Sequence, residues 1–114
     1  MNVNNLVIEA LRPCNLPVSP DFYDGNDDEY ITFNYANEYP TNFGDNVPEN
    51  DYSQLQIHYF ARGKNPQSKR REIRKLLFKA GFDVSLGPIN YESDTKKYHC
   101  VLEAGIDSVT DLEE

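Results

Sequence analysis

The sequence contains no tryptophan, only two cysteines and no apolar run near the roughly 18 residues that cross a bilayer. Cys14 and Cys100 are not at a metal-binding spacing, and we expect two reduced thiols in a cytoplasmic chain in preference to a disulfide. No basic segment precedes the first apolar residues, so we expect no signal peptide. These absences argue against a disulfide-rich secreted domain, a zinc ribbon and a helical membrane protein.

Basic residues are missing from a long stretch of the chain. No Lys or Arg occurs between Arg12 and Arg62, where nine Asp and Glu occur, whereas eight of the 11 basic residues lie between Arg62 and Lys79. The formal net charge of −8 disfavours nonspecific adhesion to DNA or to anionic lipid. The asymmetry predicts one negative and one positive surface on the same molecule.

The composition and the order of residue patterns predict one globular α+β domain spanning residues 1–114. The chain is 39% hydrophobic, and its length suffices for one modest core. The order of elements is helix, strand, strand, helix, strand, strand, which predicts a mainly antiparallel sheet with both helices packed on one face. The periodicities place helices at 2–12 and 65–81, strands at 29–36, 52–62, 82–91 and 98–106, polar loops at 21–28 and 37–51, and a flexible tail at 107–114.

Local signals mark the second helix and the inward faces of the strands. Asn65 is placed to cap the first turn, Pro66 fits that turn, and Gly81 supplies a left-handed C-terminal cap. Alternation along the strands predicts the side chains that point into the core. These are Ile31, Phe33 and Tyr35; Leu55, Ile57, Tyr59 and Ala61; and Tyr98, Cys100, Leu102 and Ala104.

The acidic stretch "DFYDGNDDEY" does not have the spacing of a calcium loop. An EF-hand loop needs glycine at its sixth position and glutamate at its twelfth. Counted from Asp24, glycine comes second and Tyr35 twelfth; counted from Asp21, the sixth residue is Asn26. Surrounding Gly, Asn and Pro favour water on all sides and argue against raised carboxyl pKa values. We interpret the segment as a solvated acidic rim, formed by Asp24, Asp27, Asp28 and Glu29.

No arrangement of nucleophile and base indicates an enzyme. His99 and Cys100 are consecutive on a strand and therefore point to opposite faces of the sheet. His58 and His99 can share the outer face, but two histidines without a third ligand make a poor zinc site. The sequence has no glycine-rich phosphate loop. We expect no catalytic residues, no metal and no cofactor.

The second helix carries a dense basic face with three interpretations that the residues alone leave open. It can contact nucleic acid, it can be a solubilising surface, or it can meet the acidic 21–51 segment of a neighbouring copy head to tail, in a contact that closes into a ring. The candidate residues are Lys69, Arg70, Arg71, Arg74 and Lys75.

Several motifs in a fixed order resemble the small tail proteins of long-tailed bacteriophages, called tail terminators, tail completion proteins or head-to-tail joining proteins. They are "YDGNDDEYITFNY", "FGDNVPENDY" before "LQIHYFAR", the helix end "LLFKAGF" and the closing "YESDTKKYHCVLEA". The resemblance covers roughly residues 20–105. It implies a small α+β domain that assembles as a hexameric ring in the tail–neck region of the virion, after synthesis in the host cytoplasm.

The same resemblance implies a function without chemistry. The ring would cap the tail tube, stop polymerisation of the major tail tube protein and dock onto the head connector, while DNA passes through its lumen without specific binding. We expect the 37–51 loop to face the lumen or the tube through Asp45, Asn46, Glu49 and Asp51. The alternatives are a head-side connector or stopper protein and, in a different class, an acidic inhibitor that mimics DNA.

Overall fold

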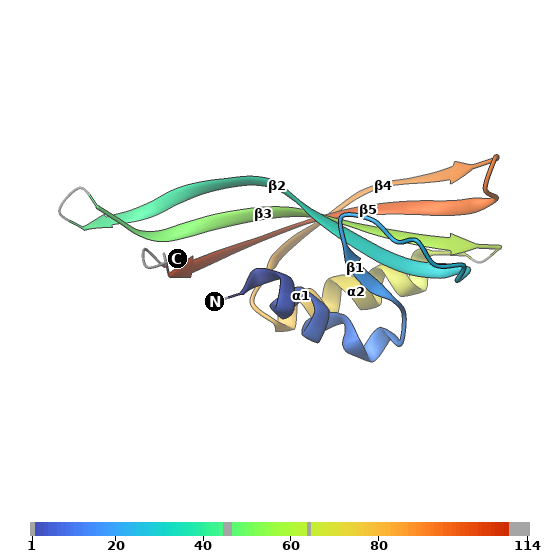
Figure 1. Cartoon of the computed structure of the whole chain (residues 1–114), viewed down its shortest axis with the longest axis horizontal. Helices are drawn as coiled ribbons and strands as arrows, with labels where there is room; N and C mark the ends of the chain where they lie inside the picture. Colours follow the sequence, from blue (N-terminus) through green and yellow to red (C-terminus); the bar gives the residue numbers. More distant parts are fainter. Residues whose placement is uncertain (1, 45–46, 64, 110–114) are drawn as a thin grey trace.

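The computed structural model describes residues 2–44, 47–63 and 65–109 and forms a five-stranded sheet with two helices on one face (Figure 1). This confirms the predicted α+β class and the placement of the helices. Strand order is β1-β2-β3-β5-β4; β1 is parallel to β2, and the other pairs are antiparallel. In chain order the elements are α1 Val3–Leu11, the 3-10 turn η1 Arg12–Cys14, β1 Val18–Pro20, β2 Glu29–Gly44, β3 Val47–Arg62, α2 Gln67–Lys79, β4 Asp83–Glu92 and β5 Lys97–Val109.

Local signals mark the start of both helices and the end of α2. The Asn2 side chain accepts a hydrogen bond from the Asn5 backbone N–H and caps α1. Asn65 Oδ1 accepts from the Gln67 N–H at 3.0 Å, so the predicted cap of α2 is confirmed. Gly81 has φ +102°, a conformation that favours glycine, and it ends α2 as predicted.

The core lies between the helices and the sheet. Ile73 and Leu77 of α2 are buried against the inward-facing side chains of the strands. The predicted inward positions are confirmed for Ile31 and Phe33 of β2, for Leu55, Ile57, Tyr59 and Ala61 of β3, and for Cys100, Leu102 and Ala104 of β5.

Tyr35 is an exception to the predicted alternation. Its side chain is 45% exposed. β1 ends opposite Phe33, so β2 becomes the edge of the sheet at Tyr35, and the register then shifts at a bulge between Tyr35 and Asn37.

The predicted polar loop at 37–51 is wrong. β2 and β3 pair through it, from Asn37 opposite Gln54 to Gly44 opposite Val47, and only residues 45–46 lie outside the described ranges. Proline has no backbone N–H to donate. Pro40 is tolerated because β1 pairs only with Ile31–Phe33, so no described strand requires a donor from this outer edge of β2.

β5 extends the same structure on the other side of β3. Asn50 of β3 pairs with Val109, so 107–109 form a strand where a flexible tail was predicted, and 110–114 lie outside the described residues. We call residues 37–44, 47–54 and 105–109 the arm. It projects beyond the helices and gives the molecule extents of 53 × 25 × 24 Å (Figure 1).

Candidate interaction surfaces

A row of stacked rings crosses the sheet face that the helices leave uncovered. Cross-strand pairing sets Tyr30 of β2 beside Phe60 of β3, and Phe60 beside His99 of β5. The ring centroids are 4.8 Å and 4.3 Å apart, and Tyr23 stacks on Tyr30 at 4.5 Å. We call these four residues the aromatic ladder. Its rings cover one another's faces, which removes the open stacking platform that single-stranded nucleic acids use.

The predicted placement of His58 and His99 on one face is confirmed, and the two are in direct contact. His58 Nδ1 and His99 Nε2 are 2.8 Å apart, and His58 Nε2 is 3.0 Å from Asn34 Oδ1. Because the Asn34 oxygen can only accept, His58 carries its proton on Nε2 and accepts from His99 at Nδ1. Burial lowers the pKa of both imidazoles. The neighbouring His99 lowers the pKa of His58 further, whereas the Glu92 carboxylate partly opposes the lowering at His99.

The histidine pair has no third ligand of the usual metal-binding kind in the described part of the chain. The Glu92 carboxylate lies 3.8 Å from His99 Nδ1, on the far side of the ring from His58. Among residues 2–44, 47–63 and 65–109, no three His, Cys, Asp or Glu side chains group where a metal ion would fit. The two imidazoles form a hydrogen-bonded contact between β3 and β5.

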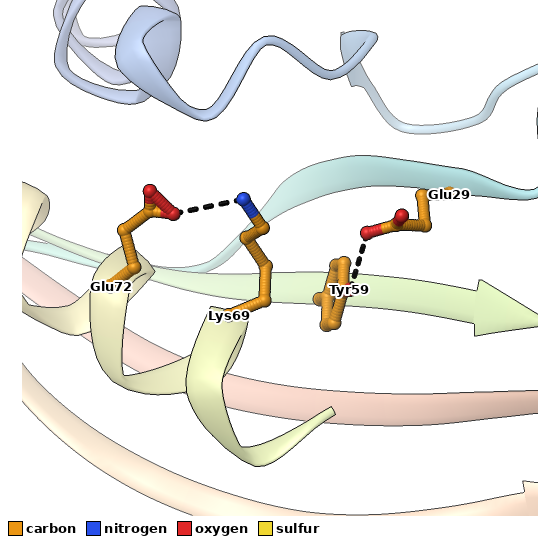
Figure 2. A network of polar contacts seen from close by, with 4 residues as sticks. All are labelled: Glu29, Tyr59, Lys69 and Glu72. Atoms are coloured by element: carbon orange, nitrogen blue, oxygen red, sulfur yellow. Dashed lines mark hydrogen bonds and ion pairs between the residues drawn. The ribbon is translucent and has the colours of Figure 1, made fainter. Parts of the chain in front are cut away.

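Polar groups on α2 and on the neighbouring strands β2 and β3 form a second cluster (Figure 2). The buried Tyr59 hydroxyl donates to Glu29 Oε2 at 2.7 Å, and Lys69 Nζ donates to Glu72 Oε2 at 2.9 Å within α2. Burial, reinforced by the hydrogen bond to Glu29, raises the Tyr59 pKa far above its usual range. The phenol stays protonated and fastens the start of β2 to β3, which is a structural role.

Glu29 therefore does not belong to the acidic rim. Its backbone starts β2, and its carboxylate turns toward the helix side of the sheet to accept from Tyr59 (Figure 2). Hydrophobic alternation could not reveal this, because the partner lies 30 residues away in β3.

Both cysteines are free and buried, as expected for reduced thiols. Burial raises the Cys14 pKa to about 11, with a smaller contribution from Glu72, and it also raises the pKa of Cys100. A protonated, buried thiol is a poor nucleophile.

The remaining rim residues are exposed, as the sequence predicts. Asp24, Asp27 and Asp28 follow β1, the edge strand of the sheet, and the Tyr23 hydroxyl donates to Asp27. The only ion pair formed here between described residues joins Asp28 to Arg62 at 3.8 Å, with both side chains largely in solvent, where such a pair adds little stability. We call residues 21–28 the acidic segment.

The candidate residues of α2 divide into two groups. Lys69 pairs with Glu72, and Arg70 donates to the Gly87 carbonyl of β4 at 3.3 Å, so both are engaged within the subunit. Arg71, Arg74 and Lys75 are exposed and form no ion pair with a described residue. Phe78, one helical turn further on, is 69% exposed. We call Arg71, Arg74, Lys75 and Phe78 the basic stripe.

The four residues of the 37–51 segment singled out from the sequence are only partly described. Asp45 and Asn46 lie outside the described residues, and Glu49 is described only as backbone within β3. Asp51 is half-buried in β3, opposite Pro40 of β2 and Ser108 of β5. The exposed aromatic side chain of Tyr39 lies near Tyr52, with ring centroids 5.3 Å apart.

At the base of the arm, a shallow groove of about 260 Å³ opens between β3, β4 and β5. The Tyr52 ring covers Gly105 so closely that an added Cβ there would lie 2.1 Å from its hydroxyl oxygen. A second, more open hollow lies between the start of α2 and β4. None of the described residues that line the groove or the hollow is a Cys, His or Lys. The groove is lined by Ala36, Tyr52, Gln54, Leu55, Asp83, Val84, Ser85, Glu103, Ala104 and Gly105.

The fold and these features define a small α+β domain whose distinctive parts are exposed surfaces: an arm, an acidic segment and a basic stripe. No helix in the described ranges is long and apolar enough to span a membrane. Neither a protein-family model nor a curated protein matches the chain. The proposal for its function therefore depends on these surfaces and on the motifs of the sequence.

Proposed function

We propose that this protein is a structural subunit of a long-tailed bacteriophage virion. In this proposal it is a tail terminator that assembles as a hexameric ring, caps the tail tube, stops its polymerisation and joins the tail to the head connector. The observation that carries the proposal is the separation of opposite charges to the two sides of one domain.

The charge separation follows from the topology. The acidic segment follows β1, which is one edge of the sheet and contacts α1. α2 contacts β4, the opposite edge, and its neighbour β5. A subunit that is acidic at one edge and basic at the other favours repeated head-to-tail contacts, and such contacts close into a ring when the rotation between subunits permits.

The arm supports a role in binding a larger assembly. Its three strands extend past the helices (Figure 1). No described residue pairs with the outer edges of β2 and β5 there, because β1 covers only Ile31–Phe33 of β2 and β4 pairs with β5 no further than Gly105. An exposed strand edge offers backbone donors and acceptors to a partner. The tube or the neck is the partner that this proposal assigns to the arm.

The test is reconstitution with the major tail tube protein, observed by negative-stain microscopy. We expect tubes of defined length with a ring at one end, whereas tubes without this protein should grow to uncontrolled lengths. Unaltered tube lengths with no bound ring would contradict the proposal. Binding to the connector ring alone would instead identify a head-side connector, and protection of DNA from a nuclease by competition would identify a DNA mimic.

A charge reversal tests the part that the arm plays. Asp45→Lys with Glu49→Lys should weaken capping, because Asp45 falls in the sequence between the end of β2 and the start of β3 and Glu49 belongs to β3. Asp94→Lys, an exposed change in the turn between β4 and β5, is the matched control and should cap normally. Equal capping by all three proteins would remove the arm from the tube contact.

A further inference from the structure

We infer that the basic stripe of one copy docks onto the acidic segment of the next, with Phe78 of the first and Phe22 of the second as paired apolar anchors. This inference rests on the proposed function, because it supplies the contact between neighbouring subunits of the ring. It adds two residues that charge patterning alone does not reveal.

Phe78 lies within the positive charges of α2. Arg71, Arg74 and Lys75 precede it by seven, four and three residues, spacings that place all four side chains on one helix face. Its ring is 69% exposed, although the neighbouring Leu77 is fully buried. An exposed aromatic ring among cations is a typical anchor of a protein interface.

The stripe faces away from α1. Arg70 lies four residues before Arg74 and eight before Phe78, and it donates to the Gly87 carbonyl in β4. Side chains at this spacing follow one side of the helix, so the row that leads to Phe78 runs along the β4 side. The stripe thus lies toward the β4 side of α2, whereas the acidic segment begins after β1, the strand at the other edge of the sheet.

Phe22 has the corresponding position among negative charges. Its ring is 72% exposed, and the exposed carboxylates of Asp24, Asp27 and Asp28 follow it. Phe22 and Phe78 are the two most exposed large hydrophobic side chains of the described residues. Each of them interrupts a charged surface, and the two surfaces have opposite sign.

The backbone holds Phe22 in place. The Asp21 N–H donates to the Phe33 carbonyl at 2.8 Å, and the Phe22 N–H donates to the Pro20 carbonyl at 2.8 Å. Tyr23, the next residue, stacks on Tyr30 of the aromatic ladder at 4.5 Å. A surface that is ordered before binding loses less conformational entropy when its partner arrives.

A second copy is the occupant that complements the stripe best. The three cations and the ring of the basic stripe match the four carboxylates and the Phe22 ring of the acidic segment, and both surfaces belong to the same chain. Nucleic acid fits less well, since the acidic chain of net charge −8 repels a phosphate backbone outside the stripe.

Disulfide cross-linking tests the contact directly. Phe22→Cys with Phe78→Cys in one chain should give, on mild oxidation, a ladder of dimers, trimers and higher oligomers. Either single variant should give no ladder, because the native cysteines are buried. Phe22→Cys with Tyr39→Cys is the matched control, since Tyr39 is also exposed but lies in the arm. Dimers alone would contradict a head-to-tail ring, and monomers alone, with and without tube protein, would overturn the inference.

A charge exchange distinguishes this contact from the other interpretations of the stripe. Arg71→Glu with Arg74→Glu should reduce self-association about tenfold or more, and so should Asp24→Lys with Asp27→Lys in a second chain. Mixing the two chains should restore association, because each altered surface then meets its complement. Absence of rescue would overturn the inference. It would also be overturned if the Arg71→Glu, Arg74→Glu variant self-associated normally but no longer retarded DNA in a gel-shift assay.

The outcomes separate the contact from the proposed function. Capped tubes without a 22–78 cross-link would overturn the contact and leave the capping role standing. A cross-linked ladder from a protein that never caps a tube would establish the contact and overturn the capping role.

Discussion

At the scale of single residues, the contact between His58 and His99 makes stability depend on pH. Burial lowers the pKa of both imidazoles below the ordinary value of 6.5, so the unfolded chain binds protons more readily than the folded one. The stabilisation is complete above about pH 6.5, which is the histidine pKa of the unfolded chain. It is lost as the pH falls through the lower pKa values of the folded state.

We predict that wild type loses more free energy of unfolding than His58→Gln between about pH 7.5 and about pH 5. Urea unfolding at intervals across that range measures the difference, and acidic groups common to both proteins cancel. Histidine NMR titrations that place both pKa values at or above 6.5 would contradict this prediction.

The hydroxyl of Tyr59 provides a second prediction at this scale. Tyr59→Phe removes the donor to Glu29 without changing the ring, and it should lower the free energy of unfolding by about 1–2 kcal/mol. Tyr91→Phe, whose ring is 55% exposed, is the control and should change stability little. Equal stability of the two variants would mean that Tyr59 contributes by packing alone.

Residue patterns in the sequence predicted burial well and predicted contacts poorly. Alternation identified Ile57 as buried and placed His58 and His99 on the opposite face, because burial follows the pleat of each strand. The stacking of Tyr30 on Phe60 depends on the register between strands, which alternation within one strand does not contain.

At the scale of elements, α2 places adjacent residues in opposite roles. Leu77→Ala opens a cavity in the core and should lower the free energy of unfolding by about 2–5 kcal/mol. Phe78→Ala removes a side chain that is 69% exposed and should leave thermal unfolding nearly unchanged while it weakens self-association. A large loss of stability in Phe78→Ala would place that ring in the subunit's own fold.

The helices could be predicted because the residues that mark them are local. The arm could not be predicted, because it depends on pairing between residues that are distant in the sequence. Asn65 and Gly81 mark the ends of α2 within a few residues of it. Residues 37–51 are rich in Asn, Pro and Asp, which disfavour strands on propensity alone. The pairing of β2 with β3, and of β3 with β5 as far as Val109, overrides that preference.

At the scale of the whole molecule, the segregated charges predict that the proposed assembly is sensitive to ionic strength. The proposed ring contact would join exposed charges, whose attraction salt screens over about 8 Å at physiological concentration. We predict that sedimentation detects weaker self-association at about 0.5 M salt than at about 0.05 M. An association that strengthens with salt would indicate an interface dominated by apolar surface.

The position of β3 has a mechanical consequence. β3 lies between β2 and β5 and is hydrogen-bonded from Asn50 to Arg62, so a continuous ribbon of paired backbone joins the arm to the layer that carries α2. A ribbon bonded on both sides should resist bending, so we expect the arm to act as a stiff lever fixed to the rest of the molecule. Seating the lever on an underlying surface would set the tilt of the whole domain, and with it the angle at which the next copy is received.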